Sequence, residues 1–495
     1  MRRRRHGEPG APRSRSVCAQ IGALASALLV SGVGSGCGPK ATSTGGAEER
    51  AGESADTKPA DTNAPTARAP GECPDLSGLD PATLPPLPES PYAATLDAVW
   101  RVVLEKHFDP TLACLDWPAL RLEYGTKLVD VDGPAAAYEL MNELLDKLGQ
   151  SHFKVVPPAA EDATEAPRGG ALAPIAARLI GDEVVVVDAA VGGVDSGVPQ
   201  GAVLLEVAGR SIPELVDAIK ERSERPSERA FEITRAVENL LSGNEGDIIA
   251  IRLRDPSAAD AEVTREVRCV TPAGEVVSLG NLRNIPTLVE GRMIEGTKIG
   301  YLAFNYWMLP MLKQVEATLG ELREAGMEAL ILDLRGNPGG VGAMSVPMAR
   351  MLLTEGGSLG TLQFRDFKQE FNVAGNPDAF TGRLVLLVDE GTASTSEIFA
   401  TGMRDLGRVE AIIGGRASAG AALPSLIERL DGGVILQYVV GDYHSSKGSV
   451  AEGDGVRPDV LVHETRDDFI AGRDPVLAAA IKALSAEPAK TEQAP

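Results

Sequence analysis

The sequence lacks an excess of positive charge. Its 495 residues include 48 Lys and Arg against 70 Asp and Glu, which gives a net charge of −22. Nucleic acids and anionic lipid surfaces attract basic proteins, because their phosphates must be neutralised on binding. The balance of charge therefore argues against a nucleic-acid partner and against electrostatic attachment to a membrane.

Long apolar runs are also absent, except for one near the N-terminus. Six arginines within the first fifteen residues precede an apolar run over residues 21–33, which leads into Gly34-Ser35-Gly36-Cys37. A basic start, an apolar centre and a small-residue end are the parts of a secretory signal, so we expect residues 1–36 to be removed on export. Their removal leaves 42 basic and 69 acidic side chains, a net charge of −27. No other apolar run is long enough to span a bilayer.

The cysteine that follows this signal resembles the lipobox cysteine of bacterial lipoproteins, which becomes the first residue and carries lipid. Gly34 stands where that motif usually has leucine. The resemblance implies a lipid anchor on Cys37. The next residue is Gly38 and not the aspartate associated with retention in the inner membrane. In a two-membrane cell we therefore expect the protein on the periplasmic face of the outer membrane. One acyl chain binds a membrane only marginally, so several chains would be needed. Cleavage nearby and an uncleaved anchor remain alternatives.

Cysteine is otherwise scarce. Beyond Cys37 the chain contains only Cys73, Cys114 and Cys269. In an exported protein Cys73 and Cys114 could pair, and the sequence leaves this open. Their spacing matches no metal site, and no metal or other cofactor is expected.

Apolar side chains are missing from residues 38–72, which contain no Ile, Leu, Val, Met or aromatic residue. Such a stretch cannot bury a core, so we expect a disordered tether over residues 37–90. A helical domain at 91–155 should follow, because apolar residues then recur at helical spacing. The residues concerned are Leu96, Val99, Trp100, Val103 and Leu104, and later Tyr138, Met141, Leu144, Leu145 and Leu148.

Residues 170–272 are predicted to be rich in β-structure. Short apolar runs at 178–180, 183–188, 202–207 and 248–253 are separated by turn residues, with helical patterns near 213–222 and 229–242. Within this region residues 196–210 resemble the core of a PDZ domain of bacterial proteases, with Ala202 in place of the usual aspartate. The resemblance implies a domain that binds an extended peptide by strand addition. A β-rich spacer without a ligand is the alternative.

Residues 285–485 alternate between strands and helices. Strands are expected at 299–304, 329–334, 384–388 and 434–438, and helices near 309–325, 341–354 and 395–406. The chain is thus predicted to be a multi-domain α/β protein with a layered sheet-and-helix domain in its C-terminal half.

A strand at 383–389 runs through a Ser- and Thr-rich turn at 390–397 into a helix. The first turn of a helix has unpaired N–H groups and a positive dipole end, so an oxyanion formed beside a serine there is stabilised. The G-x-S-x-G string of other serine hydrolases is absent. Ser, Thr and Glu at a helix start can also form only a capping box.

A Gly-rich turn, Asp333 to Gly340, ends another buried strand and exposes backbone N–H groups. It lacks the G-x-G-x-x-G of dinucleotide-binding proteins. The turn instead matches the D-L-R-x-N-x-G-G motif of the C-terminal-processing and tricorn-type serine peptidases. Residues 392–397 match the (S/T)-A-S-x-(S/A)-E turn of that family, and residues 455–459 match its G-V-x-P-D strand.

The chain therefore resembles this peptidase family over residues 90–485. The resemblance implies a crotonase/ClpP-like catalytic domain at 285–485, with Ser394 as the nucleophile of an exported serine endopeptidase. It implies peptide or protein substrates, and an oxyanion hole formed by the N–H of Thr395 and that of Gly339 or Gly340.

The two branches of the family differ in the group that activates the serine. The C-terminal-processing branch uses a lysine, but Gly420 stands at about that position and residues 414–421 contain none. Arg416 cannot replace it, because a guanidinium stays protonated. Lys447 lies too far along the chain, in a polar loop.

The tricorn-type branch has a serine–histidine pair at the end of a helix, which residues 145–152 match closely. The match implies His152 as general base, since a histidine normally titrates near neutral pH. Ser151 would bridge His152 to Glu452, with Asp454 as the competing carboxylate. The alternative function is a non-catalytic protein that binds peptides or lipophiles on the same scaffold. The sequence does not determine the oligomeric state.

Overall fold

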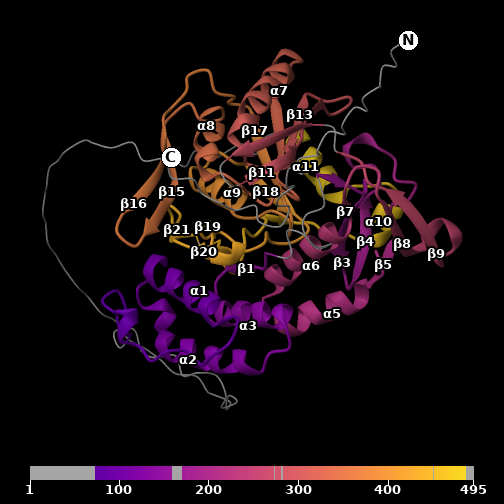
Figure 1. Ribbon diagram of the computed structural model, residues 1–495. Coiled ribbons are helices and arrows are strands. Elements are labelled where there is room, and N and C mark those ends of the chain that lie inside the picture. The colour runs from indigo at the N-terminus through magenta and orange to yellow at the C-terminus, as the bar shows by residue number, and fades with distance from the viewer. Residues whose placement is uncertain are drawn as a thin grey trace, which may run out of the picture.

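The computed structural model describes residues 73–158, 170–223, 225–271, 274–279, 282–449 and 451–486. The expected signal peptide at 1–36, the lipidation site Cys37 and the first part of the tether lie outside these ranges. A helical region, a β-rich domain and an α/β domain follow one another along the chain (Figure 1). None of the described helices is both long and apolar enough to cross a membrane.

Three helices make up most of the N-terminal region. They are α1 (Ala93–Lys106), α2 (Trp117–Lys127) and α3 (Pro134–Asp146). The apolar positions expected in α1 are all buried, as are Met141, Leu144 and Leu145 in α3. The sequence pattern did not predict α2. This helix is fixed by Trp117, which stacks on Trp100 and donates its indole N–H to the Trp100 carbonyl at 3.2 Å.

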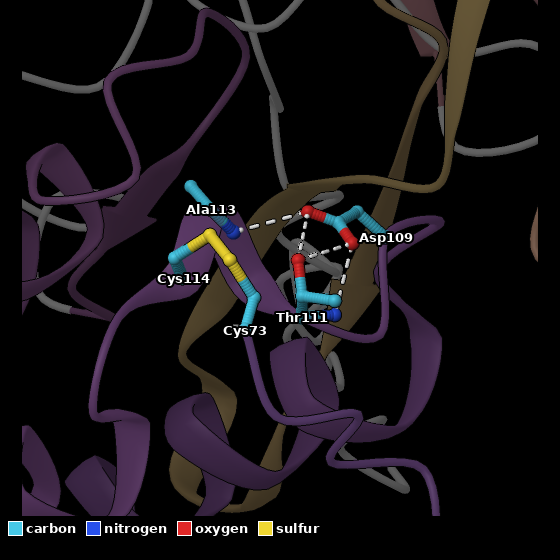
Figure 2. Close-up of a disulfide and its surroundings, with 5 residues drawn as sticks. All are labelled: Cys73, Asp109, Thr111, Ala113 and Cys114. Carbon is cyan, nitrogen blue, oxygen red and sulfur yellow. Dashed lines mark hydrogen bonds between the residues drawn. A yellow bond between two sulfur atoms is a disulfide. The ribbon is translucent and has the colours of Figure 1, made fainter. Parts of the chain in front are cut away.

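Residues 73–90, which the tether was expected to include, pack against the rest of the described structure. Cys73 and Cys114 form a disulfide, and the Asp109 carboxylate accepts from the N–H groups of Thr111 and Ala113 beside it (Figure 2). Several leucines between residues 76 and 87 pack against the main core. These apolar side chains distinguish residues 73–90 from residues 38–72, whose sequence contains none.

The β-rich domain, residues 170–271, has its own hydrophobic core. Its antiparallel sheet runs β3 (Ala176–Ile180), β4 (Glu183–Asp188), β5 (Val203–Val207), β8 (Ile248–Asp255) and β9 (Ala261–Arg268), with β6 (Arg210–Ser211) paired to β5. The helices are α5 (Ile212–Arg222) and α6 (Pro226–Leu240), and β2 (Ala171–Leu172) pairs with β7 (Ser242–Gly243). The expected strands and helices are present, and β9 was not predicted.

The α/β domain is built on a six-stranded sheet. Its order is β12 (Val289–Met293), β13 (Ile299–Phe304), β14 (Ala329–Asp333), β17 (Arg383–Val388), β18 (Ala411–Gly414) and β22 (Val460–Leu461). All pairs are parallel except β12 with β13. Helices α7 (Leu312–Glu324), α8 (Ser345–Arg350) and α9 (Thr395–Asp405) cover one face and α11 (Pro475–Ser485) the other, so the central strands are buried on both sides.

Smaller sheets extend this domain, and one of them reaches the N-terminal region. The antiparallel sheet of β1 (Lys154–Val156), β20 (Ile435–Val439) and β19 (Ser425–Arg429) joins the end of that region to the C-terminal part of the chain. The strand expected at 434–438 is β20, which lies outside the main sheet. The remaining elements are the sheet of β16 (Lys368–Val373), β15 (Gly357–Phe364) and β21 (Gly441–His444), the hairpin of β10 (Glu275–Leu279) and β11 (Leu282–Thr287), and α10 (Arg466–Ile470).

Candidate active site

Ser394 lies in the turn between β17 and α9. The neighbouring parallel strand β14 ends in the Gly-rich turn, so both turns lie at the same edge of the sheet. They are in direct contact, because a Cβ at Gly339 would lie 2.7 Å from the Ser394 Cβ. The Asn337 carbonyl accepts from the Ala393 N–H at 3.1 Å. A glycine is therefore needed at position 339 for the Ser394 turn to approach.

The backbone of Ser394 adopts a conformation that is rare for a serine, with φ 54° and ψ −117°. The residue is 2% exposed and immediately precedes the first residue of α9, Thr395. Strained conformations of this kind persist where the surrounding structure enforces them, often at functional sites. The arrangement presents a serine at a helix N-terminus, as in the nucleophile elbow of other hydrolases.

His152 lies between α3 and β1, and it also has a left-handed backbone, with φ 63°. Its Nδ1 is 2.7 Å from the Ser151 Oγ, which in turn lies 2.9 Å from Glu452 Oε2. The Ser151 N–H donates to Glu452 Oε1 at 2.9 Å. Ser151 and Glu452, 301 residues apart in the sequence, are thus joined by two hydrogen bonds.

This chain of contacts fixes where the proton of the His152 ring lies. An ionised carboxylate only accepts, so the single hydroxyl hydrogen of Ser151 is donated to Glu452. The Ser151 oxygen then accepts from the ring, which requires the hydrogen on His152 Nδ1. The lone pair of Nε2 is left available to take a proton.

Burial shifts the titration of both groups. It lowers the pKa of the His152 imidazole from 6.5 to about 4, so the ring is neutral at neutral pH. Burial raises the pKa of the Glu452 carboxyl, and the hydrogen bonds from Ser151 and from the Ala422 N–H act in the opposite direction. All these bonds favour the ionised form of Glu452, which is the form that accepts the Ser151 hydroxyl hydrogen.

The loop at residues 418–422 connects the two halves of the site. The Ser394 N–H donates to the Ala421 carbonyl at 2.8 Å, and the next N–H, that of Ala422, donates to Glu452 Oε2 at 2.8 Å. Within the described chain no hydrogen bond joins the Ser394 hydroxyl to the His152 ring. Catalytic contacts commonly shorten only when substrate is bound.

Of the three amides expected to form the oxyanion hole, one is already engaged. The Gly339 N–H donates to Asn337 Oδ1 at 3.0 Å. For the amides of Gly340 and Thr395, no hydrogen-bond acceptor is found among the described residues. These two N–H groups are therefore the better pair to bind an oxyanion.

The competing residues lie elsewhere or do not fit. The Asp454 side chain is 71% exposed and pairs with Arg457. The Lys447 N–H bonds to Asp405 at the far end of α9, about 15 Å along the helix from Ser394. A side chain at Gly420 would not fit, because its Cβ would lie 2.6 Å from the Gly453 carbonyl oxygen.

Sequence reasoning assigned no role to His107, which nevertheless supports the loop before Ser151. His107 is buried, its Nε2 lies 2.8 Å from Gln150 Oε1, and its ring stacks on Phe153. No motif in the sequence marks it. The only signal would have been its position at the end of α1.

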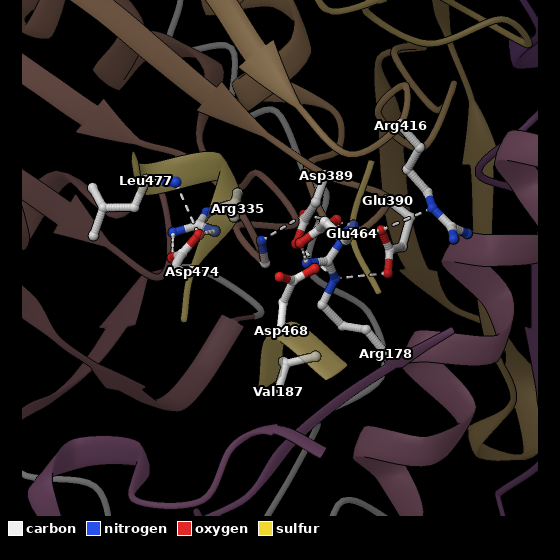
Figure 3. A network of polar contacts seen from close by, with 12 residues as sticks. Arg178, Val187, Arg335, Asp389, Glu390, Arg416, Glu464, Asp468, Asp474 and Leu477 are labelled. Carbon is white, nitrogen blue, oxygen red and sulfur yellow. Dashed lines mark hydrogen bonds and ion pairs between the residues drawn. The ribbon is translucent and has the colours of Figure 1, made fainter. Parts of the chain in front are cut away.

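A buried ion-pair network ties the β-rich domain to the nucleophile turn (Figure 3). Arg178 on β3 donates to both carboxylate oxygens of Glu390 at 2.9 Å and to Glu464 at 3.1 Å. Asp389 lies 3.4 Å from the same guanidinium, and burial raises the pKa of its carboxyl to about 6. Asp389 follows the last residue of β17 and Glu390 begins the turn, so Arg178 binds the chain where the strand passes into the nucleophile turn.

The helix α6 of the β-rich domain also contacts the site. Arg225, at its start, donates to the Gly149 carbonyl at 2.7 Å, and Ser227 Oγ donates to the Gly453 carbonyl at 2.7 Å. Phe231 packs against three alanines of the nucleophile turn and the 418–422 loop, namely Ala393, Ala419 and Ala421. The domain that carries α6 thus borders the Ser394 turn. Among the described residues, no group of three or more His, Cys, Asp or Glu side chains could hold a metal ion.

A buried serine at a strand–turn–helix junction, with the amides of Gly340 and Thr395 near it and His152 connected to it through the 418–422 loop, is an arrangement typical of a serine hydrolase. Residues 298–462 match the model of peptidase family S41. A carboxyl-terminal-processing protease of Picosynechococcus is 23% identical over 73% of this chain and 81% of its own length. Another, from Synechocystis, is 25% identical over 75% of this chain and 81% of its own.

Two solved structures share the fold. The photosystem II D1 C-terminal processing protease matches with a TM-score of 0.52 and 21% identity, over 81% of this chain and 98% of that one. Mature CPAF matches with a TM-score of 0.53 and 13% identity, over 79% and 96%. The α/β domain is thus similar to the peptidase domains of family S41, and the protein is a serine-type peptidase.

Proposed function

We propose that the protein is an exported endopeptidase that cleaves peptide bonds through an acyl-enzyme on Ser394, with His152 as the general base. The observation that carries the proposal is the hydrogen-bonded sequence His152 Nδ1, Ser151 Oγ and Glu452, joined through Ala422 to the loop that binds the Ser394 backbone. The absence of room for a side chain at Gly420 supports a histidine rather than a lysine base.

In the first step the Ser394 Oγ attacks the peptide carbonyl carbon while its proton passes to His152 Nε2. The carbonyl oxygen becomes an oxyanion, which the amides of Gly340 and Thr395 stabilise. The C–N bond then breaks, and the leaving amine takes the proton from His152.

In the second step a water molecule gives a proton to His152 Nε2 and attacks the acyl group. The Ser394 oxygen leaves, recovers that proton, and the free carboxylic acid is released. Throughout, Ser151 and Glu452 hold the ring in one tautomer and stabilise the imidazolium that forms, as the third member of a catalytic triad does.

A fluorophosphonate probe tests the nucleophile directly. The wild-type protein should be labelled on Ser394, and Ser394→Ala and His152→Ala should abolish labelling. His444→Ala is the matched control, because that ring is 60% exposed and lies on β21. Labelling on Ser396 instead would show that the wrong serine had been chosen. No labelling at all would favour the non-catalytic peptide- or lipophile-binding alternative.

We also infer that the β-rich domain is PDZ-like and presents the C-terminal end of an extended peptide to Ser394. The contacts of α6 with the loops around Gly149 and Gly453 support this role, because they place the domain beside the site. Strand addition supplies backbone hydrogen bonds that tolerate many sequences. Deleting the domain should raise KM for long substrates more than for short ones, and an equal effect on both would reduce it to a spacer.

The membrane anchor is likewise our proposal. The arginine-rich start, the apolar run and the small residues before Cys37 support lipidation of that cysteine and, in a two-membrane cell, attachment to the periplasmic face of the outer membrane. Cys37→Ser should release the protein from the membrane fraction. Mass spectrometry of a mature N-terminus without acyl groups would refute the anchor.

A further inference from the structure

Glu397 lies in the first turn of α9, three residues after Ser394, and its side chain is completely buried. Its Oε2 accepts from the Ser394 N–H at 2.9 Å and from the Ala421 N–H at 3.0 Å. Its Oε1 accepts from Ser418 Oγ at 2.5 Å and from the Gly420 N–H at 2.8 Å. A glutamate at this position usually caps only its own helix. Here three of its four donors come from another segment.

That segment is the 418–422 loop, two consecutive amides of which bind carboxylates, the buried Glu397 and the partly buried Glu452. Glu397 accepts from Ala421, and Glu452 accepts from Ala422. The loop is further fixed by the Gly453 N–H, which donates to the Gly420 carbonyl at 2.7 Å. Ser394 binds this loop in two ways, directly at the Ala421 carbonyl and through Glu397, and the loop is connected to His152 through Glu452 and Ser151.

We propose that Glu397 is a positioning residue, and that its carboxylate must be ionised to keep Ser394 within reach of His152. The inference rests on the proposed function, since it concerns the same serine and histidine. An ionised carboxylate has about four acceptor sites, and all four are occupied by donors. A proton on Oε2 would face two N–H donors, so one of those bonds would be lost, and a proton on Oε1 would require the Ser418 hydroxyl to turn its own hydrogen away.

The surroundings of Glu397 make this ionisation occur near neutral pH. Burial raises the pKa of the carboxyl from 4.5 to about 7, against the opposing hydrogen bonds from Ser418, Gly420, Ser394 and Ala421. These four neighbours are uncharged. The titratable groups on adjoining segments face other partners. Glu452 binds Ser151 and Ala422, Asp389 and Glu390 face Arg178, and Arg416 lies 3.6 Å from Glu390.

The neutral His152 ring does not account for a change near pH 7, because burial lowers its pKa to about 4. The acid limb of the kcat/KM profile should therefore follow Glu397, with activity rising as its carboxyl loses a proton around pH 7. Removing one donor from the carboxylate raises its pKa further.

The experiment compares Glu397→Gln and Ser418→Ala with the matched control Asp405→Asn in the full-length protein. Asp405 is a buried carboxylate at the last residue of the same helix, where it accepts from the Lys447 N–H at 2.9 Å. For each variant, fluorophosphonate labelling of Ser394 and the kcat and KM of peptide hydrolysis are measured from pH 5 to 9.

Glu397→Gln should lower kcat and the labelling rate by roughly 100-fold with little change in KM, as expected for a misplacement near 1 Å. Ser418→Ala should move the acid limb to higher pH, and Asp405→Asn should leave both kcat and the limb unchanged. A Glu397→Gln protein as active as the wild type, or an unmoved limb in Ser418→Ala, would overturn the inference. If Glu397→Gln does not fold, the limb in Ser418→Ala decides alone. If the wild-type protein is not labelled at Ser394, both the proposed function and this inference are wrong.

Discussion

The two halves of the active site are built in different ways. The nucleophile half comes from one strand–turn–helix unit, residues 383–405, and the turn of the neighbouring strand β14. The base half combines Ser151 and His152 from the N-terminal region with Glu452, 301 residues away. Glu397 and the 418–422 loop connect them. The serine thus lies in one local strand–turn–helix unit that distant contacts reinforce, whereas the histidine depends on tertiary contacts for its carboxylate partner, so disturbances should reach the two halves by different routes.

The largest effect is expected when either half loses its reacting group. Ser394→Ala and His152→Ala should each lower kcat by about 10⁴-fold or more, and the double variant should lose no more than either alone, because groups that act as a unit are not additive. Steady-state hydrolysis of a peptide substrate measures this. Independent, multiplying losses would show that the two residues do not act together.

Loss of the support behind His152 should cost less. Ser151→Ala and Glu452→Gln leave the imidazole present but release its tautomer, so we expect kcat to fall by roughly 10²- to 10⁴-fold. Asp454→Asn is the matched control and should change nothing, because its side chain is 71% exposed. If Asp454→Asn impaired kcat as much as Glu452→Gln, the carboxylate would have been assigned wrongly.

Breaking the ion-pair network that joins the β-rich domain to the nucleophile half should mainly lower the stability of the protein. Arg178→Met leaves the buried Asp389 and Glu390 without the guanidinium they share, with only Arg416 near Glu390, which should lower the free energy of unfolding by about 3–5 kcal/mol. Arg222→Met removes an exposed ion pair with Glu232 and should cost no more than about 1 kcal/mol. Urea denaturation measures the unfolding free energy of both variants. Equal losses would mean that the buried network stabilises the fold no more than an exposed ion pair does.

The smallest predicted effect is a difference between the wild type and Glu397→Gln in how Tm depends on pH. The folded-state pKa of Glu397 is raised above its unfolded value, so the native protein holds this proton more tightly. The corresponding stability is present below pH 4.5 and is lost as the pH rises toward 7, while activity increases. Glu397→Gln has no such ionisation, so thermal unfolding between pH 5 and 8 should show a smaller loss of Tm than in the wild type. Parallel Tm curves would contradict the shifted pKa.

Much of the fold followed from sequence patterns. The apolar runs and helical spacings gave β13, β14 and β17 as well as α1, α3, α5, α6 and α9 close to their observed bounds. Helix α2 and strand β9 were not recognised, because α2 has a weak apolar periodicity and β9 is mostly polar and exposed. The order at residues 73–90 also escaped prediction, since it depends on the disulfide and on leucines packed against distant helices.

The sequence by itself determined which residues could carry the chemistry. A serine before a helix, a Gly-rich turn after a parallel strand and a Ser–His pair at a helix end are local patterns, and local backbone physics sets their geometry. Only the tertiary structure decided that Ser151 bridges His152 to Glu452 rather than to Asp454, that Gly420 leaves no space for a side chain, and that Glu397 binds the loop between them. Those contacts join segments far apart in the chain, and their distances and burial arise from packing, which no spacing of residues along the sequence encodes.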